Sequence, residues 1–283
     1  MVKKYGIVYL MGGFGNQLFQ LCFAESLRNK NLTVYIDTTN YLQENKRSNV
    51  VAENRELTIP IEEFGFKGVP FYLKKLFLIN NYLRNYSFKN YNFLPVGRFN
   101  DNNINENYRK YNQFVGYWQD VEIILKNKDY LKSILLKNEV INKGLNSQSA
   151  KGSTALHIRR GDYLKMTEEL KIDYYKQAID LAKKKIENFT YDVFTDDKEW
   201  TLNEAVFKDA DNIYYSSPSI ENTIETFSNF FKYENYIISN STFSLIPALL
   251  NVENGVTIAP DPWFKNKKKS MIYPENWLTI KNQ

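Results

Sequence analysis

Runs of apolar residues alternate with helical patterns at the start of the chain. Residues 5–11 are mostly apolar, and a glycine-rich turn at 12–15 interrupts them. Residues 16–29 then place apolar side chains at helical spacing, and residues 33–37 form a second short apolar run. This pattern predicts a strand, a tight turn, a helix and a second strand, an order that is typical of α/β proteins.

The pattern is weaker in the middle of the chain. Aromatic, Asn and Lys residues interleave without a clear period from residue 38 to residue 116. Short helices are still expected near 60–64 and 69–84. Residues 114–119 are typical of a strand that ends at a functional loop, and residues 120–145 are typical of helix.

A second α/β alternation follows residue 153. The expected elements are, in chain order, strand 154–158, helix 173–188, strand 191–194, strand 212–215, helix 219–232, strand 236–238, helix 245–250 and strand 256–259. Small polar residues at 146–153 are the best linker candidate. Because 283 residues suffice for about two domains of ordinary size, we expect an α/β fold with two Rossmann-like domains, 1–150 and 151–283.

Composition narrows the class of protein. Hydrophobic residues make up 43% of the chain and charged residues 24%, as in soluble globular proteins. No apolar run reaches the roughly 18–20 residues that cross a bilayer, and the run at 6–11 is too short for a signal peptide. Cys22 and His157 are the only residues of their kinds, so an intrachain disulfide, a thiolate zinc site and a His-rich metal centre are excluded. A cytoplasmic location fits these features.

The net charge of +5 favours anionic partners such as nucleotides, nucleic acid or a membrane surface. The densest basic cluster, Lys265 to Lys269, is typical of a solvated loop, and contact with an anionic lipid or glycan is the alternative. Peripheral contact with a membrane is therefore an expectation for this segment.

The first chemical motif is the turn at 12–17, Gly-Gly-Phe-Gly-Asn-Gln, between a strand and a helix. Its backbone amides can face an anion at the helix N-terminus. A dinucleotide fingerprint is one interpretation, since Asp37 lies at the right distance to hold a ribose, but Leu18 stands where the third glycine should be. The amides of Asn16 and Gln17 suit hydroxyls and phosphate oxygens, while an ordinary tight turn is the plain alternative.

The second motif is His157-Ile-Arg-Arg-Gly-Asp162, at the end of a predicted strand. Ligands of α/β sheets bind beyond the strand ends, and alternation along the strand puts His157 and Arg159 on one face. Arginine grips phosphates through paired donors, so Arg159 and Arg160 indicate an anion site. For His157 a purely structural role is an equal alternative.

Two more polar clusters follow predicted strands. In the first, Asp196 and Asp197 can bind a metal, hold ribose hydroxyls or cap the next helix. In the second, residues 239–244 offer five small polar side chains at a helix start, which favours a phosphate cradle over a simple cap. The four clusters together predict a nucleotide-sugar site between two Rossmann-like domains.

In this order the motifs resemble those of glycosyltransferase family 11, the α-1,2-fucosyltransferases. The strings that carry the resemblance are Gly12-Gly-Phe-Gly-Asn-Gln-Leu-Phe-Gln20, Val115-Gly-Tyr-Trp-Gln119, His157-Ile-Arg-Arg-Gly-Asp-Tyr163, Val193-Phe-Thr-Asp-Asp197 and Ile238-Ser-Asn-Ser-Thr-Phe-Ser244. The resemblance implies a GT-B-like pair of domains facing across a cleft, with acceptor contacts in 1–150 and GDP-fucose in 151–283. It implies inverting transfer of L-fucose from GDP-β-L-fucose to the 2-hydroxyl of a galactose-containing glycan, without an obligatory metal or nucleic acid partner, and a role in surface polysaccharide synthesis.

The motifs and the resemblance together name the expected site residues. We expect catalytic roles for Arg159, which corresponds to the diphosphate ligand of the family, and for Asn16 and Gln17. We expect substrate contacts from Gly13, Gly15, His157, Arg160, Asp162, Asp196, Asp197, Asn240, Ser241, Thr242, Phe243 and Ser244.

The chain departs from the family pattern near the nucleotide base. Leu245 and Ile246 stand where two tryptophans are usual, and Glu225 and Thr226 lie where an Asp is usual. Base contacts are therefore less well defined than phosphate contacts. No carboxylate stands out as general base, although Glu25 and Asp37 are candidates.

Three rival functions stay open. The turn at 12–15 could serve an NAD-dependent enzyme, and the basic charge and aromatic residues could serve a non-catalytic glycan-binding protein. The third rival is a transferase that uses another GDP-sugar or forms another linkage, because the motifs constrain GDP more than the acceptor.

Overall fold

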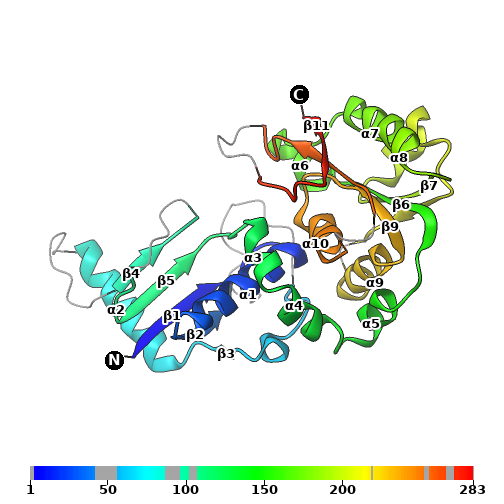
Figure 1. Cartoon of the computed structure of the whole chain (residues 1–283). Helices are drawn as coiled ribbons and strands as arrows, with labels where there is room; N and C mark the ends of the chain where they lie inside the picture. Colours follow the sequence, from blue (N-terminus) through cyan, green and yellow to red (C-terminus); the bar gives the residue numbers. More distant parts are fainter. Residues whose placement is uncertain are drawn as a thin grey trace. The chain divides into compact units, whose positions relative to one another are not determined.

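The computed structural model describes residues 3–41, 56–86, 96–101, 107–217, 219–251, 255–265 and 271–282. The chain divides into two compact units (Figure 1). Unit 1 comprises Met1–Val50 and Ile59–Gln119, and unit 2 comprises Val51–Thr58 and Asp120–Gln283. Each unit has its own parallel β-sheet, and the units are described one at a time.

Unit 1 is built on a parallel sheet in the order β3-β2-β1-β5-β4. Its described elements are β1 (Lys4–Tyr9), α1 (Phe14–Asn29), β2 (Leu32–Asp37), η1 (Thr39–Tyr41), η3 (Ile61–Phe64), β3 (Lys67–Gly68), α2 (Phe71–Tyr86), β4 (Val96–Phe99) and β5 (Tyr111–Val115). The order of strands reverses between β1 and β5. Because these two strands are neighbours and run parallel, the turn after β1 and the loop after β5 lie at the same edge of the sheet.

Helices α1 and α2 cover opposite faces of this sheet. Phe114 of β5 packs edge-on against Phe23 of α1, with ring centroids 5.5 Å apart. Tyr111 of the same strand packs edge-on against Phe77 of α2 at 6.4 Å. Because side chains alternate along a strand, residues 111 and 114 point to different faces. The sheet is therefore buried on both sides, as is usual for parallel sheets.

Unit 2 contains a parallel sheet in the order β11-β10-β9-β6-β7-β8. Its described elements are α3 (Val121–Lys126), α4 (Lys128–Leu135), α5 (Glu139–Leu145), β6 (Ala150–Ile158), α6 (Gly161–Met166), α7 (Ile172–Lys185), β7 (Thr190–Thr195), α8 (Lys198–Asn203), η4 (Ala205–Phe207), β8 (Asn212–Tyr215), α9 (Ile220–Phe230), β9 (Tyr233–Ile237), α10 (Thr242–Leu250), β10 (Thr257–Asp261) and β11 (Leu278–Lys281). Numbered from β6, this is the doubly wound order 3-2-1-4-5-6, which reverses between β6 and β9.

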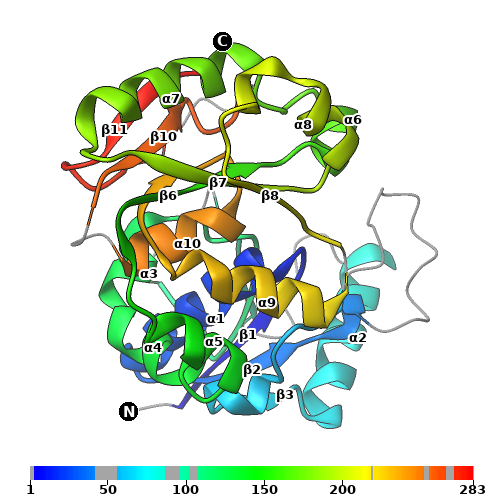
Figure 2. The ribbon, with the colours of Figure 1, turned by 90° about the vertical axis from the view of Figure 1, so that its right-hand side faces the viewer.

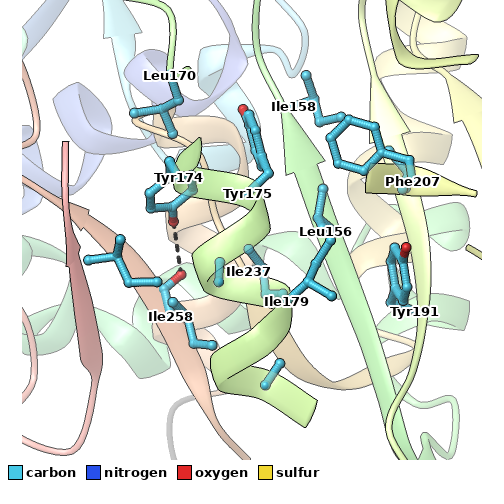
Figure 3. Close-up of a cluster of buried hydrophobic side chains, with 14 residues drawn as sticks. Leu156, Ile158, Leu170, Tyr174, Tyr175, Ile179, Tyr191, Phe207, Ile237 and Ile258 are labelled. Carbon is cyan, nitrogen blue, oxygen red and sulfur yellow. Dashed lines mark hydrogen bonds between the residues drawn. The ribbon is translucent and has the colours of Figure 1, made fainter. Parts of the chain in front are cut away.

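Helices cover both faces of the unit 2 sheet. Figure 2 shows α7 and α8 on one side of β6, β7 and β8, and α9 and α10 on the other. On the α7 side, Tyr174, Tyr175 and Ile179 pack with strand residues such as Leu156 and Ile237 in one buried cluster (Figure 3). This cluster holds the central strands in place and so positions the loops that follow them.

The predicted α/β fold with two Rossmann-like parallel sheets is confirmed. That the two domains face each other across a cleft stays a prediction. The predicted linker at 146–153 is wrong, because β6 begins at Ala150 and lies in the middle of its sheet. The small polar residues there form an irregular strand start, where the register with β9 shifts between Ala150 and Thr154 and Gly152 has φ +82°.

The structure also places the division between units earlier than the predicted boundary at residue 150. Unit 2 includes Asp120–Leu145, since these helices pack onto its own elements: α3 contacts α10, and α5 contacts α9. At the α5–α9 contact Ser228 donates a hydrogen bond to the carbonyl of Val140, and a Cβ on Gly144 would lie 2.2 Å from the Ser228 carbonyl oxygen. The single helix predicted for 120–145 is three short helices.

Candidate functional site

Three of the four sequence motifs meet at one edge of the unit 2 sheet. Strands β9, β6 and β7 are neighbours and run parallel, so their carboxyl ends lie side by side. Residues 239–244 follow β9, residues 159–162 follow β6, and Asp196 and Asp197 follow β7. The order of the sheet reverses between β6 and β9, which is the place where doubly wound sheets bind ligands.

Arg159 forms the centre of this edge. Its Nη2 lies 2.6 Å from a carboxylate oxygen of Asp162, and its Nη1 lies 2.8 Å from Asp196. Desolvation lowers the pKa of Arg159, but the carboxylates of Asp196 and Asp162 outweigh it and raise the pKa above its ordinary value. The side chain stays 23% exposed. The guanidinium is thus a permanent, oriented cation that an anionic ligand can reach.

Arg160 is held differently, against β7 and α8. Its backbone N–H donates to Asp196 at 2.8 Å, and its Nε donates to Asp197 at 3.0 Å. The guanidinium carbon lies 3.9 Å from the ring centroid of Trp200. Asp197 also caps α8, because its other carboxylate oxygen accepts from the Trp200 N–H. The two aspartates therefore anchor the two arginines, and Asp197 has the helix-capping role that was one sequence interpretation.

His157 lies beneath this edge and is 4% exposed. Its Nδ1 lies 2.9 Å from the hydroxyls of both Ser239 and Ser244. Desolvation, and secondarily the charge of Arg159, lower the pKa of His157 to about 3. The ring is therefore neutral at physiological pH, and its contacts join the end of β6 to the start of α10.

The turn at 239–244 satisfies much of its polarity internally. Ser241 caps α10 by accepting from the Phe243 N–H, and Ser244 donates to the Ser241 carbonyl as well as contacting His157. Asn240 is fully buried and donates to the Glu168 carbonyl at 2.7 Å. The backbone N–H of Ser244 also donates to the Ser241 carbonyl. The side-chain hydroxyls that were predicted to form a phosphate cradle therefore mainly fix the start of α10.

Two predicted residues of this turn are less enclosed than the others. Thr242 is 8% exposed and opens α10. Phe243 is half-buried, and its ring centroid lies 5.9 Å from that of His157. The aromatic side chain therefore covers the histidine from the α10 side.

The first motif lies at the equivalent edge of unit 1, between β1 and β5. Gly12 has φ +81°, a conformation that favours glycine, and an added Cβ there would lie 2.6 Å from Nδ2 of Asn16. Gln17 is buried and donates to the Gly12 carbonyl at 3.3 Å. Gly13 precedes α1 as its N-cap, and Gly15 is buried in its first turn. Gln17 therefore holds the turn together.

Asn16 is joined to a residue that sequence reasoning did not select. Its Oδ1 accepts a hydrogen bond from Nε2 of Gln119 at 2.8 Å, so the turn after β1 and the loop after β5 share one amide pair. The signal that could have found Gln119 is its place in the Val115–Gln119 string, at the end of a predicted strand. The amide pair is half-buried at the edge where the strand order reverses.

Asp101 is the second residue that the sequence did not reveal. Its carboxylate accepts from the backbone N–H of Tyr117 at 3.0 Å and of Trp118 at 2.6 Å. Trp118 has φ +55°, and an added Cβ on Gly116 would lie 2.7 Å from the Asp101 carboxylate. Asp101 thus fixes the sharp loop that presents Gln119. It lies in an Asn-rich stretch, which gave no signal.

The two candidate general bases are engaged in local structure. Glu25 forms an ion pair with Arg28 at 3.1 Å. Asp37 accepts from the backbone N–H of Thr39 at 2.9 Å, at the start of η1. Both carboxylates thus have a partner on the same helix or in the same turn.

Two features do not occur in the part of the chain that the structure describes. Within it, no group of three or more His, Cys, Asp or Glu side chains is arranged to hold a metal ion. None of the helices in the described ranges has the length and apolar character needed to cross a membrane.

Comparison with known proteins gives matches along nearly the whole chain. The family model described as Glycosyl transferase family 11 matches residues 7–281. The chain is 27% identical over 311 residues to an alpha-1,2-colitosyltransferase of Escherichia coli, covering 97% of this chain and 98% of that one. It is 28% identical over 304 residues to the O-antigen biosynthesis glycosyltransferase WbnK of Escherichia coli, covering 96% and 99%.

A solved structure of similar extent is that of the fucosyltransferase NodZ from Bradyrhizobium. The TM-score is 0.44 and the sequence identity 16%, and the match covers 88% of this chain and 92% of that one.

Proposed function

Because the chain belongs to glycosyltransferase family 11, we propose that it transfers L-fucose from GDP-β-L-fucose to the 2-hydroxyl of a galactose-type acceptor, with inversion at the anomeric carbon. The family match confirms the resemblance that the motifs carried, and the chain is a glycosyltransferase. The name of one Escherichia coli relative, the O-antigen biosynthesis glycosyltransferase WbnK, supports a role in building O-antigen or a related surface polysaccharide. We propose that the chain acts in the cytoplasm.

The proposal rests mainly on Arg159, a cation that is held in one orientation where the order of strands reverses between β6 and β9. When a nucleotide-sugar donor reacts, its nucleoside diphosphate is the leaving group. Negative charge therefore develops in the transition state on the diphosphate oxygen that was bonded to the sugar. Arg159 is partly exposed directly after β6, whose neighbour β9 leads into the turn before α10. A fixed cation stabilises such charge most when it is already in place, and the amino end of a helix adds to the effect. Asp162 and Asp196 hold the guanidinium in one orientation before the donor arrives.

The proposed reaction is a single displacement. The bond between the fucose anomeric carbon and the diphosphate oxygen breaks, and its electron pair stays on GDP. The acceptor 2-hydroxyl oxygen bonds to that carbon from the opposite side, and its proton passes to a base or to water. In this scheme Arg159 supplies positive charge to the leaving group, and we therefore expect transfer to proceed without an added metal.

The amide pair of Asn16 and Gln119 is the proposed contact for sugar hydroxyls. Side-chain amides offer a donor and an acceptor at fixed positions, which suits a hydroxyl that must both donate and accept. The pair is neutral and half-buried, so it discriminates by hydrogen bonding rather than by charge. Gln17, for which a catalytic role is predicted, donates to the Gly12 carbonyl in the same turn and so helps to hold Asn16 in position.

A ligand panel tests the donor, and a transfer assay tests the reaction. Thermal unfolding is measured with GDP, GDP-fucose, GDP-mannose, UDP and NAD, each with and without EDTA. We expect stabilisation by the GDP ligands alone and no effect of EDTA, followed by fucosylation of lactose-type acceptors with an α-1,2 linkage by NMR. Stabilisation by NAD, or by none of these ligands, would contradict the proposal.

A second donor is favoured by one of the relatives. The colitosyltransferase covers almost the same length as this chain, and colitose is L-fucose without its 3-hydroxyl. The ratio of kcat/KM for GDP-fucose and GDP-colitose decides between the two. A site that hydrogen-bonds the 3-hydroxyl should reject the deoxy sugar strongly, because its polar groups would be left unpaired.

A further inference from the structure

Helix α2 has a second apolar face that unit 1 does not bury. Leu73 and Phe77 are buried against the sheet in a cluster with Ile7. The opposite side of the helix carries four large apolar side chains that are 56% to 71% exposed, namely Phe71, Tyr72, Leu78 and Ile79. At 3.6 residues per turn these four positions fall on one side of the helix. We call them, with Lys74 and Lys75, the α2 patch.

The α2 patch is positively charged as well as apolar. Lys75 lies among the four apolar positions on the helix surface, and its Nζ is 4.7 Å from the ring centroid of Phe71. Lys74 flanks the same side and is half-buried. No acidic residue occurs in the described part of α2, Phe71–Ile79, so nothing on the helix itself neutralises the two lysines.

The sequence around α2 concentrates the positive charge of the chain. Residues 65–100 contain six Lys or Arg residues and no Asp or Glu, a net charge of +6. The whole chain has +5, so the remaining residues together carry −1. The same 36 residues include ten Phe or Tyr. Basic and aromatic residues around an exposed apolar helix face are the composition of segments that lie in a lipid–water interface.

We propose that the α2 patch docks this protein onto an anionic membrane surface. The four apolar side chains enter the headgroup region, while Lys74 and Lys75 extend to the lipid phosphates, each contributing attraction that falls with salt. A second copy of the chain fits less well, because a symmetric contact would bring Lys75 against its own counterpart. Nucleic acid fits less well too, since the patch is mainly apolar. The proposal rests on the patch and not on the identity of the sugar donor.

Vesicle flotation of the full chain tests the proposal. We expect co-flotation with vesicles of phosphatidylcholine and phosphatidylglycerol at 3:1, weaker flotation with phosphatidylcholine alone, and release at 0.5 M salt. The double variants Phe71→Ser/Leu78→Ser and Lys74→Glu/Lys75→Glu should each weaken binding at least tenfold. The matched controls are Leu202→Ser, at a side chain that is 60% exposed on α8, and Lys184→Glu/Lys185→Glu on α7. These controls should bind like the wild type.

A fluorescent label locates the contact. Cys22 is fully buried, and burial raises the pKa of its thiol, so a cysteine introduced by Leu78→Cys can be labelled selectively with an environment-sensitive dye. The emission should shift to the blue on addition of anionic vesicles, and the same label introduced by Leu202→Cys should not respond.

Three results would overturn the proposal. They are failure of the wild type to float with anionic vesicles, binding of the patch variants at wild-type strength, and an unchanged label at position 78. Size-exclusion chromatography of the wild type and the Phe71→Ser/Leu78→Ser variant adds a fourth, since a dimer that only the variant loses would assign the patch to a second copy. Donor transfer to a soluble acceptor confirms that each variant is folded.

Discussion

The two units place chemically different groups at the same topological position. In unit 2 the order of strands reverses between β6 and β9, and that edge carries Arg159 with the carboxylates of Asp162 and Asp196. In unit 1 the order reverses between β1 and β5, and that edge carries the neutral amides of Asn16 and Gln119. One architecture thus supplies an edge centred on a cation and an edge centred on a pair of neutral amides, which we call the charged edge and the uncharged edge.

In the function that we propose, this difference separates binding of phosphate from binding of sugar. A diphosphate carries its charge into the transition state, so a fixed cation acts on the bond that breaks. A sugar hydroxyl carries no charge, so amides suffice to position it. The charged edge is also braced by ion pairs, because Arg159 pairs with Asp196 and Arg160 with Asp197, both directly after the neighbouring strand β7, whereas Asn16 and Gln119 are joined by a hydrogen bond between neutral groups.

Replacement of the central arginine should have the largest effect. Arg159→Ala is expected to lower kcat/KM by about 100-fold or more, because it removes the charge that stabilises the leaving group. Arg159→Lys should recover only part of the loss, since a lysine cannot hold two carboxylates in the same geometry. Initial rates at subsaturating donor measure the effect, and circular dichroism checks the fold. A variant with more than a tenth of wild-type activity would show that the charged edge does not act on the leaving group.

The pH dependence of stability should also distinguish the units, because the single histidine lies in unit 2. The pKa of His157 is lowered to about 3 in the folded protein, against about 6.5 in the unfolded chain. Between these values the unfolded chain binds the extra proton, so stability falls as the pH falls from about 6.5. At pH 5 the expected loss is about 2 kcal/mol.

Hydrogen exchange at pH 7 and pH 5 measures this loss in unit 2. A His157→Gln variant, whose side chain can still bond to the serine hydroxyls, should lose this part of the pH dependence. If wild type and variant respond to acid equally, another group is responsible and the histidine is not held neutral by burial.

At the uncharged edge, Asn16→Ala and Gln119→Ala should each lower kcat/KM for the acceptor by about tenfold, since each removes the hydrogen bond that orients the partner amide. The affinity for GDP should not change. Because the two residues share one hydrogen bond, the double variant should be little worse than either single variant. Full additivity of the two effects, or a parallel loss of GDP affinity, would break the proposed separation of the two edges.

Most of the architecture followed from the sequence, because buried parallel strands leave strong apolar runs. The strand at 212–215 has the predicted limits, and the motif after β6 lies at a strand end as expected. The predicted linker at 146–153 failed since its small polar residues begin a central strand, and local composition does not report the partner strands on both sides. The division between units depends on α5 packing onto α9, a contact between residues far apart in the chain.

The sequence indicated which residues lie at the candidate site, but it did not indicate in which direction their side chains point. The sequence identified Arg159 and the carboxylates around it, but it could not indicate that Ser239 and Ser244 turn inward to His157. Asp101 and Gln119 were missed because their roles arise from the loop after β5, which has φ +55° at Trp118 and which Asp101 fixes by accepting from the Trp118 N–H. Such roles depend on backbone geometry that short motifs do not encode.

The smallest expected effect concerns this loop and sharpens the comparison within unit 1. Asp101→Asn keeps the shape of the side chain but removes its charge, which weakens the bonds that it accepts from the N–H groups of Tyr117 and Trp118. We expect a loss of stability of about 1 kcal/mol and a decrease in acceptor kcat/KM of only a few fold, because Gln119 stays near Asn16 but is held less firmly. Thermal unfolding and acceptor kinetics measure the two effects.

Asp120→Asn, at the neighbouring cap of α3, is the matched control and should leave the acceptor kinetics unchanged. If Asp101→Asn instead impaired GDP binding while leaving the acceptor kinetics intact, the loop would belong to the nucleotide side and the assignment of the two edges would be reversed.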